Sequence, residues 1–331
     1  MIITRTPFRI SFFGGGTDYP VWTQEQEGAV LATTIDKYCY ITCRYLPPFF
    51  KHRSRIIYSR MEMINEINEI QHPSVRACLR FLNILRGIEI HHDADLPART
   101  GIGSSSSFTV GLLNALYALI GKMSGKEQLY QDAIHIEQRL IQENVGSQDQ
   151  VMAACGGFNV VRFKEGNRIF VQPITLDSQR LRVLKSHLLL YFTGFSRFSS
   201  DVASEQIQNT PVKKQELKAM YEMVFEAIHI LNSGQEITQF GKLLHESWML
   251  KKSLSSKITT PFLDEIYAVA RKEGALGGKI LGAGGGGFML LFASPEYHPK
   301  IKEKLKDFLY VPFEFENLGS QVIYYAQPQE F

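Results

Sequence analysis

The residues best suited to chemistry gather in one stretch of the 331-residue chain, 96–121, which reads LPARTGIGSSSSFTVGLLNALYALIG. Gly101 and Gly103 let the backbone come close to a ligand, and four serines follow at 104–107. The apolar residues after the serines recur at spacings of three and four, which predicts a helix with one buried face. Serines in front of such a run are typical N-caps. We therefore expect unpaired N–H groups at the positive end of a helix, an arrangement suited to binding phosphate.

The same stretch is not a Walker A loop, because no Lys-Ser/Thr pair follows its glycines. If the stretch binds nucleotide phosphates, a cation must come from elsewhere in the chain, and a serine hydroxyl could reach Mg²⁺. The alternative interpretation is a capped core helix that follows a flexible loop. Residue types and spacing alone leave both interpretations open.

Three carboxylates stand out elsewhere in the sequence. Asp18 follows three glycines in a tight turn, where it either bonds its own backbone or holds sugar hydroxyls. Glu137 lies on a predicted amphipathic helix, 126–145, and is either solvated or functional. Asp149 lies in a predicted loop, 146–157, whose small residues look buried. A buried carboxylate needs a charged partner or a function.

The composition excludes several classes of protein. A hydrophobic content of 44%, a charged content of 21% and a net charge of +3 are ordinary for a globular protein. Without a dense Lys/Arg run, we expect no nucleic-acid partner. The four cysteines show no CxxC spacing, which argues against a zinc site or a disulfide framework. No signal-peptide pattern and no apolar run of about 18 residues is present, so we expect a cytoplasmic protein without a membrane partner.

The order of elements predicts an α+β protein with a domain boundary near residue 185, giving domains 1–184 and 185–331. Strands are expected at 2–13, 29–46 (two strands meeting near Asp36), 88–96, 158–163, 168–174 and 188–194. Helices are expected at 73–86, 211–233, 236–253 and 261–273. The chain should end in a unit with strands at 279–281, 288–293, 310–315 and 321–326 and a helix at 299–308. The last strands and helix predict a ferredoxin-like second domain.

One glycine motif is misleading. Gly282, Gly284 and Gly287 satisfy G-x-G-x-x-G, the fingerprint of dinucleotide-binding domains. That fingerprint requires a helix after the glycines and an acidic residue about 20 positions later. Here the glycines lead into a strand-like FMLLFA near the end of the chain. The sequence therefore argues against a dehydrogenase.

Three segments in this order resemble the GHMP kinase superfamily of galactokinase, homoserine kinase and mevalonate kinase. TPFRISFFGGGTDY resembles the first motif (PGRxNLxGEHTDY), and LPARTGIGSSSS resembles the second (P-x-x-x-G-L-G-S-S-A), which binds phosphate. KILGAGGGG resembles the third, which implies that Gly284, Gly285 and Gly286 support the second. The resemblance implies a two-domain GHMP-kinase fold, with an N-terminal domain like ribosomal protein S5 domain 2 and a ferredoxin-like C-terminal domain.

Within the superfamily, the segments RTPFRISFFGGGTDYP, ATTIDKYCY, IQHPSVR and NVGSQDQ are similar to one branch. Its members use ATP to phosphorylate the anomeric C1 hydroxyl of D-glycero-D-manno-heptose 7-phosphate, on the way to nucleotide-activated heptoses for surface polysaccharides. GGG in place of the family's GEH argues against galactose as the substrate. The alternatives are a kinase of an unphosphorylated sugar, such as fucose, and a sensor that binds sugar and ATP without turnover.

The resemblance also implies a role for individual residues. Asp149 would be the catalytic base, Arg9 its basic partner, and Ser105 and Glu137 the ligands of Mg²⁺. The residues expected at the ATP phosphates are Arg99, Thr100, Gly101, Ile102, Gly103, Ser104, Ser105 and Ser106. The residues expected at the sugar are Gly15, Gly16, Thr17, Asp18 and Arg197. For the 7-phosphate, Arg197 is preferred to Arg99, Arg53 and Lys51, because it follows a buried strand that would end at the cleft. A homodimer is left open.

Overall fold

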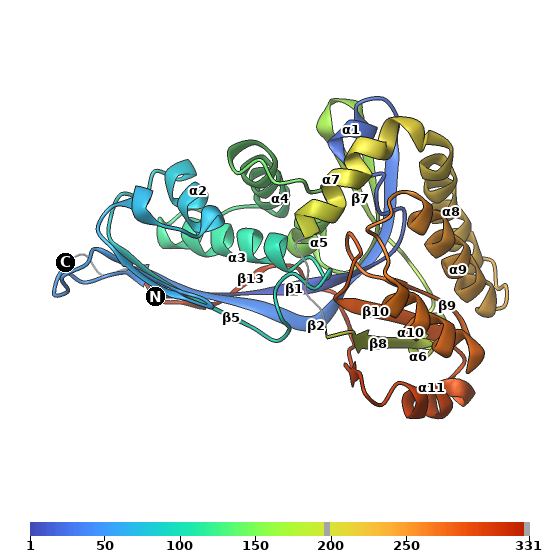
Figure 1. Ribbon diagram of the computed structural model, residues 1–331. Helices are drawn as coiled ribbons and strands as arrows, with labels where there is room; N and C mark the ends of the chain where they lie inside the picture. The colour runs from blue at the N-terminus through green and yellow to red at the C-terminus, as the bar shows by residue number, and fades with distance from the viewer. Residues whose placement is uncertain (195–198, 328–331) are drawn as a thin grey trace.

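Two β-sheets form the framework of the protein in a computed structural model that describes residues 1–194 and 199–327 (Figure 1). The larger sheet runs in the order β13-β1-β2-β5-β3-β4, and β6, β7 and β12 join it beside β2. Its strands are β1 (Ile2–Phe13), β2 (Gly28–Tyr45), β3 (Ser54–Ile57), β4 (Met61–Ile64), β5 (Ile88–Ala94), β6 (Phe158–Lys164), β7 (Arg168–Pro173), β12 (Phe315–Glu316) and β13 (Gln321–Tyr325). Among the pairings described, β3 with β5 is parallel and the others are antiparallel.

The long hairpin of β1 and β2 is the spine of this sheet. The sequence predicts two strands between residues 29 and 46, but β2 is one continuous strand. Pro7 pairs with Tyr38 and Phe8 with Ile35, so the two residues between them in β2 bulge out of the ladder. Proline has no N–H to donate, and a bulge beside it allows the pairing to continue on both sides.

Helices cover one face of the larger sheet, above the strands in Figure 1. They are α2 (Pro73–Phe81), α3 (Ser104–Leu119), α4 (Lys126–His135) and α5 (Gln148–Cys155). The helix predicted after the serines is confirmed as α3, but residues 106–113 are all buried, so this part of the helix is enclosed on all sides and not along one face. Residues 146–157, predicted as a loop, contain α5. The predicted helix 126–145 is shorter than expected, because α4 passes into a π-helix, Ile136–Leu140.

The smaller sheet is antiparallel and runs in the order β11-β8-β10-β9. Its strands are β8 (Leu188–Phe192), β9 (Ala275–Ile280), β10 (Phe288–Ala293) and β11 (Leu309–Tyr310). The remaining helices are α1 (Pro20–Thr23), α6 (Ser178–Ser186), α7 (Ser199–Asn209), α8 (Lys214–Asn232), α9 (Thr238–Ser253), α10 (Pro261–Lys272) and α11 (His298–Lys304). The helices predicted at 211–233, 236–253 and 261–273 are therefore confirmed as α8, α9 and α10.

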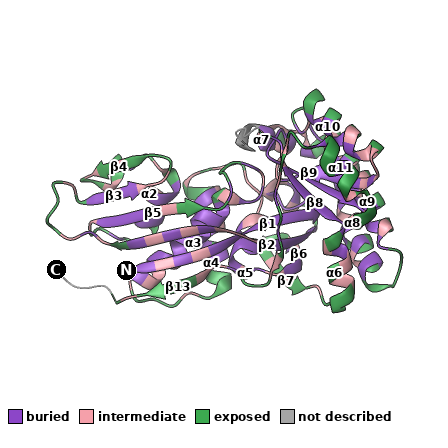
Figure 2. Ribbon diagram, turned by 90° about the horizontal axis from the view of Figure 1, so that it is seen from below, coloured by how far each residue is buried: buried purple, intermediate pink, exposed green. Residues whose placement is uncertain are grey.

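The hydrophobic core continues from one sheet to the other, as the buried residues in Figure 2 show. Phe12 of β1 packs edge-on against Phe240 of α9, with ring centroids 5.6 Å apart. Phe240 in turn contacts Phe292 of β10 at 5.9 Å. This shared core fixes α9 and the following strands relative to β1, and so fixes both sides of the cleft described below.

The end of the chain differs from the sequence prediction. The strands expected at 310–315 and 321–326 do not complete the smaller sheet. Only β11 pairs there, with β8. The next strands, β12 and β13, return to the larger sheet and pair with β2 and β1. A division at residue 185 therefore falls between β7 and β8, where the chain passes from the larger sheet to the smaller one. The last segment, which contains β12 and β13, returns to the larger sheet.

Within the described part of the chain, no helix is both long enough and apolar enough to cross a bilayer.

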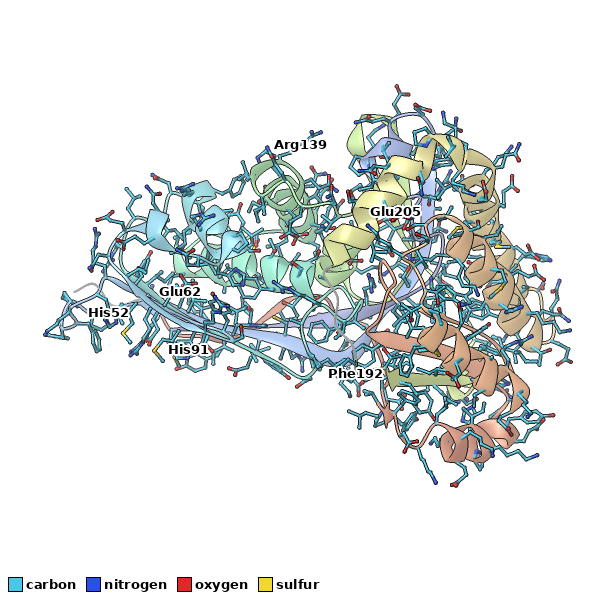
Figure 3. The ribbon with its side chains drawn as sticks, in the orientation of Figure 1. His52, Glu62, His91, Arg139, Phe192 and Glu205 are labelled. Carbon is cyan, nitrogen blue, oxygen red and sulfur yellow. The ribbon has the colours of Figure 1, made fainter. Side chains whose placement is uncertain are left out.

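His91 lies on the larger sheet, distant from Glu205 of α7 in Figure 3, and its Nε2 is 3.1 Å from Glu89 Oε1. His92, the next residue, packs against the Phe108 ring instead. The two histidines therefore have different neighbours.

Candidate active site

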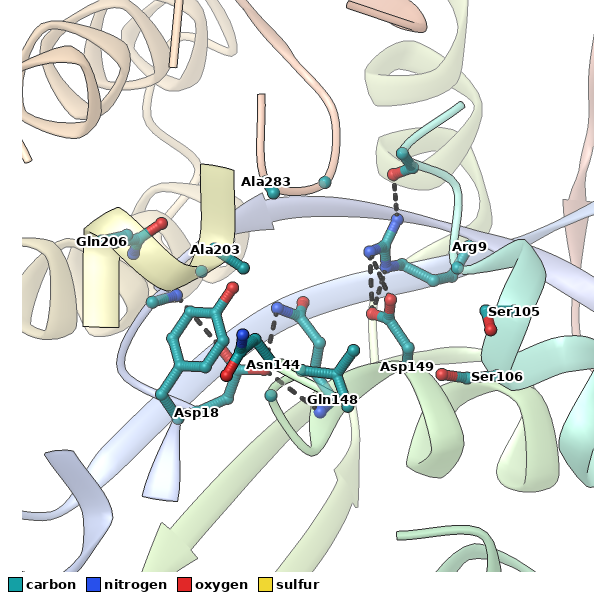
Figure 4. A pocket seen from close by; sticks show the side chains of 18 of the residues that line it. Arg9, Asp18, Ser105, Ser106, Asn144, Gln148, Asp149, Ala203, Gln206 and Ala283 are labelled. Carbon is teal, nitrogen blue, oxygen red and sulfur yellow. Dashed lines mark hydrogen bonds and ion pairs between the residues drawn. The ribbon is translucent and has the colours of Figure 1, made fainter. Parts of the chain in front are cut away.

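A cleft lies where the two halves of the molecule meet (Figure 4). One wall is the glycine–serine loop (residues 97–106), which leads into α3, together with the loop before α5. The opposite wall comes from the glycine turn after β1, from α7 and α9, and from the loop after β9. The lining residues are Arg9, Gly15, Gly16, Asp18, Tyr19, Arg99, Gly101, Gly103, Ser104, Ser105, Ser106, Asn144, Val145, Gly146, Gln148, Asp149, Ala203, Gln206, Lys251, Gly282 and Ala283.

Arg9 and Asp149 form a bidentate ion pair in this cleft. Arg9 Nε and Nη2 donate to the two carboxylate oxygens of Asp149, each at 2.8 Å, and Nη1 donates to the Gly101 carbonyl. Arg9 is 3% exposed, whereas the Asp149 side chain keeps 26% of its surface open. Burial raises the pKa of Asp149, and the Arg9 guanidinium opposes that rise. The pair therefore holds an accessible carboxylate in one orientation.

The start of α3 faces the same carboxylate. Its N-cap is Gly103 with φ +76°, not a serine as predicted, and no side chain caps the helix. The first helical bond runs from the Ser107 N–H to the Gly103 carbonyl, which leaves the N–H groups of 104–106 without an acceptor in the described structure. A Cβ on Gly103 would lie 3.4 Å from Asp149 Cγ. The carboxylate and a phosphate-binding helix end are therefore neighbours.

Glu137 lies beneath the serines, on the π-helix. It is 0% exposed, and its Oε2 accepts hydrogen bonds from Ser106 Oγ at 2.8 Å and from Gln150 Nε2 at 2.5 Å. Its Oε1 accepts no hydrogen bond in the described structure, since the nearby Thr109 hydroxyl donates to the Ser105 carbonyl. Burial raises the pKa of Glu137 to about 7, and the Thr109 hydroxyl opposes that rise. The serine in contact with Glu137 is thus Ser106, whereas Ser105, the predicted magnesium ligand, is exposed on the cleft wall.

Asp18 ties the glycine turn to the start of α5. Its Oδ1 accepts the N–H of Gly16 at 3.0 Å, and its Oδ2 accepts the backbone N–H and the side-chain amide of Gln148 at 3.2 and 3.1 Å. The turn-forming interpretation is therefore confirmed, and Asp18 still lines the cleft at 2% exposure. Gly146 must be a glycine, because a Cβ there would lie 1.9 Å from Asp18 Oδ2.

The third glycine segment packs directly on the glycine–serine loop. A Cβ on Gly282 would lie 2.5 Å from Gly101 Cα, and one on Gly287 would lie 2.2 Å from the Thr100 carbonyl oxygen. The predicted supporting residues were Gly284, Gly285 and Gly286. Gly284 lies against the Ile258 backbone, and the Gly285 N–H donates to the Ile258 carbonyl. The glycines in contact with the loop are therefore Gly282 and Gly287, and the chain after them enters β10 rather than a helix.

Replacing Gly282 by Ala is expected to destabilise the protein and lower its activity. The methyl group would press on the backbone of Gly101, which moves only if the glycine–serine loop moves. Overpacking of this kind costs roughly 1–3 kcal/mol. The left-handed φ of +70° adds about 1 kcal/mol. Urea unfolding and kcat would measure the two effects.

Gly234 provides the matched control for this variant. Its φ is +74°, close to that of Gly282, and a Cβ there would meet nothing within 4 Å. Gly234→Ala therefore carries the backbone strain alone. Equal losses of stability in the two variants would mean that Gly282 does not support the loop through packing.

Several predicted residues lie behind the cleft wall or outside the described structure. Thr100 and Ile102 are fully buried; the Thr100 carbonyl accepts the Phe288 N–H, and the Ile102 carbonyl accepts the Arg9 N–H. Thr17 is also buried, and its hydroxyl donates to the Gly14 and Ala29 carbonyls. The two backbone carbonyls and the Thr17 hydroxyl therefore hold the loop and the turn in shape. Arg197 lies outside the described residues.

The cleft residues that sequence reasoning missed include Gln148, Gln206 and Lys251. Gln206 of α7 lies on Gly16, where a Cβ would be 2.4 Å from its Nε2. Lys251 of α9 donates to the Gly282 carbonyl at 2.6 Å. Gln206 and Lys251 come from helices with ordinary amphipathic patterns, which give no signal for a site. Gln148 stands next to Asp149, and that adjacency was the available signal.

The fold and the three glycine segments around the cleft define the class of protein. The chain matches the GHMP kinase N-terminal domain over residues 70–157 and the GHMP kinase C-terminal domain over residues 224–311. It belongs to the GHMP kinase superfamily and is an ATP-dependent kinase.

Among known proteins, the chain is similar to D-glycero-alpha-D-manno-heptose 7-phosphate kinase of Campylobacter jejuni. The two are 28% identical over 96% of this chain and 97% of that protein. The bifunctional fucokinase/GDP-fucose pyrophosphorylase of Arabidopsis thaliana is 24% identical over 91% of this chain, which corresponds to 31% of that longer protein. The crystal structure of a D-glycero-D-manno-heptose 1-phosphate kinase from Bacteroides thetaiotaomicron superposes with a TM-score of 0.79 at 22% identity, covering 98% of this chain and 100% of that one.

Proposed function

We propose that this protein transfers the γ-phosphoryl group of ATP to the anomeric C1 hydroxyl of a heptose 7-phosphate. The observation that carries the proposal is the Arg9–Asp149 pair beside the open N-terminus of α3. A base and a phosphate-binding site within one cleft are what phosphoryl transfer to a hydroxyl requires. The similarity to the Campylobacter jejuni kinase over nearly the whole length of both proteins supports the choice of sugar.

Asp149 accepts the proton of the sugar hydroxyl as its oxygen attacks the γ-phosphorus. Each carboxylate oxygen uses one lone pair for Arg9 and keeps another for the substrate. Arg9 orients the carboxylate and favours its ionised form. The N–H groups of 104–106 face the charge that develops on the transferring group. An anomeric hydroxyl is more acidic than an ordinary alcohol, so a carboxylate is a sufficient base.

The residues around Glu137 fit a magnesium ion. Glu137 Oε1 is a buried carboxylate oxygen without a hydrogen-bond partner among the described residues, and a cation would satisfy it. No three His, Cys, Asp or Glu side chains converge there or elsewhere in the described structure. Mg²⁺ does not need such a cluster, because it is bound by one or two carboxylates, substrate phosphates and water. Glu137 and a serine hydroxyl, from Ser105 or Ser106, would hold the ion, which offsets phosphate charge when bound.

Two buried amides suit a substrate with many hydroxyls. Gln148 and Gln206 both line the cleft, and neither Gln148 Oε1 nor Gln206 Nε2 has a hydrogen-bond partner in the described part of the chain. One atom is an acceptor and the other a donor, and a sugar hydroxyl can satisfy either. Unpaired buried polar atoms are costly, so groups of this kind select a ligand that completes them.

The test is a kinase assay over a panel of sugars with ATP and Mg²⁺. ADP release should be fastest with D-glycero-D-manno-heptose 7-phosphate, and the product should be the 1,7-bisphosphate. Faster turnover of free fucose or galactose would favour a kinase of an unphosphorylated sugar. Binding of sugar and ATP without ADP release would favour a sensor. Either result would contradict the proposal.

A further inference from the structure

The glycine–serine loop has no lysine of its own to meet the transferred phosphoryl group. Its glycines are followed by serines. The first motif brings one basic side chain to the loop, Arg9, and Arg9 already makes hydrogen bonds within the protein. Three of the Arg9 donors are used: two on Asp149 and one on the Gly101 carbonyl. Within the loop, the helix N–H groups carry only partial charges, and the full positive charge belongs to Arg99, which lines the cleft.

Lys251 brings a full positive charge to this loop from the other half of the molecule. It lies on α9, is 4% exposed, and donates from Nζ to the Gly282 carbonyl at 2.6 Å. Gly282 packs on Gly101 of the loop, as described above. On the other side, a Cβ on Gly15 of the glycine turn would lie 3.7 Å from Nζ. The ammonium is therefore located between the loop and the turn, and it lines the cleft.

The Lys251 ammonium is incompletely satisfied. It has three donors, and the structure records one hydrogen bond, to a neutral carbonyl. No carboxylate of the described residues lies within ion-pair distance of it. Burial lowers the pKa of Lys251 to about 8, and the charge on Asp18 opposes that effect. A buried ammonium is costly without an anionic partner, and a phosphate in the cleft would be that partner.

A second buried lysine, Lys279 of β9, serves as a comparison, because it is buried for structural reasons and away from the cleft. Its Nζ donates to the Phe12 carbonyl at 3.0 Å, and burial lowers its pKa as well. It does not line the cleft. Burial and a carbonyl partner are therefore common to both lysines, whereas access to the cleft belongs to Lys251.

We propose that Lys251 binds the γ-phosphoryl group of ATP and stabilises it during transfer, so that α9 supplies the lysine that the glycine–serine loop lacks. The inference rests on the transfer site proposed above at Asp149, and it does not depend on which sugar is used. In the step itself, the sugar oxygen forms a bond to the γ-phosphorus while the bond from that phosphorus to the leaving ADP oxygen breaks. The hydroxyl proton goes to Asp149, and Lys251 neither gains nor loses a proton.

Lys251→Met tests the proposal through turnover and through nucleotide binding. A lost contact to the transferring group should lower kcat by about 10²–10³ and leave KM for the sugar nearly unchanged. Binding should be measured by calorimetry with Mg²⁺, for ADP and for a non-hydrolysable ATP analogue. The preference for the analogue over ADP should fall by roughly ten- to a hundredfold, because a charged hydrogen bond to the γ-phosphate is removed.

Two further variants separate this role from a structural one. Lys251→Arg keeps the charge and should restore part of both the turnover and the analogue preference. Lys252→Met removes the neighbouring lysine, whose Nζ is 3.0 Å from Asp264 Oδ1 outside the cleft, and should behave like the unaltered protein.

Three results would overturn the proposal. The first is a loss of stability and turnover in Lys251→Met with an unchanged analogue preference, which would assign the lysine to holding Gly282. The second is a rise in the KM for the sugar alone, which would make it a sugar contact. The third is a Lys251→Arg variant that folds but restores neither turnover nor preference. Failure of the unaltered protein to phosphorylate any sugar of the panel would count against the proposed function, and the nucleotide preference would still test Lys251.

Discussion

Replacing Asp149 by Asn is expected to lower kcat by roughly 10²–10⁴ while leaving ATP affinity nearly unchanged. An amide cannot take the proton of the sugar hydroxyl, and the N–H groups at the start of α3 do not depend on that carboxylate. Asn is close in shape to Asp, so the cleft should keep its form. Steady-state kinetics gives the loss in turnover, and calorimetry with a non-hydrolysable ATP analogue gives the affinity. Near-normal turnover would remove Asp149 from the role of base.

The stability of this variant has to be measured beside its activity. Arg9 is 3% exposed and would lose the charge of its only carboxylate partner recorded in the described structure. Breaking a buried pair on one side costs about 3–5 kcal/mol, and the amide oxygen of Asn recovers part of that by accepting one Arg9 hydrogen bond. Urea unfolding therefore separates a folded, inactive enzyme from an unfolded one. Asp264→Asn, at the Lys252 ion pair outside the cleft, is the control and should leave both turnover and stability nearly unchanged.

The part of the site that could be predicted from the sequence is the part made by short, local patterns. Glycines followed by serines and an apolar run predict a helix whose start can bind phosphate, although the same pattern also fits a capped core helix. Asp149 stood out because a carboxylate among small, buried residues needs a partner. That partner is Arg9, 140 positions away in the sequence. Spacing gave no reason to join the two, and their pairing rested on the family resemblance.

The rest depended on contacts that no local pattern encodes. Lys251 is one of two adjacent lysines on α9, and periodicity does not reveal that one faces a cleft while Lys252 pairs with Asp264. The alternation of 321–326 predicts a strand but not its neighbour, so β13 was assigned to the wrong sheet. The segment 146–157 begins with turn-forming residues, and the eight-residue helix α5 within it is stabilised by packing on β1 and α3.

The π-helix after α4 is a third feature of this kind. It puts Glu137, with 0% exposure, beneath the serines of the glycine–serine loop. Single-turn π-helices are rare and often occur at functional sites, where they change the direction of one side chain. An α-helical periodicity drawn through 126–145 already puts Glu137 on the face of Ala133, four residues earlier, which is fully buried. The role of this glutamate was suggested by the family resemblance, because a glutamate on an amphipathic helix is by itself either solvated or functional.

Glu137→Gln is expected to weaken Mg²⁺ binding and, in the absence of metal, to change how stability depends on pH. The pKa of Glu137 is about 7 in the folded protein and about 4.5 in an unfolded chain. The folded state therefore holds the proton more tightly, and this group lowers the free energy of unfolding as pH rises from 4.5 to 7. The shift in pKa corresponds to a loss of about 3 kcal/mol in the free energy of unfolding. The Glu137→Gln protein does not show this loss, because its amide does not titrate. In EDTA, the difference in urea stability between the two proteins should change by that amount across this pH range.

Magnesium should reverse which of the two proteins, unaltered or Glu137→Gln, is the more stable above pH 7. The ion binds the ionised carboxylate and so offsets the cost of burying it, whereas an amide offers a weaker ligand. With Mg²⁺ and an ATP analogue at pH 8, the unaltered protein should gain stability that Glu137→Gln does not gain. The Mg²⁺ concentration for half-maximal turnover should rise at least about tenfold in the variant. Glu127→Gln, which changes an exposed carboxylate on α4, is the control and should keep the magnesium response. An unchanged response in Glu137→Gln would show that the metal is held elsewhere. The unpaired oxygen of Glu137 would then destabilise the fold without contributing to metal binding.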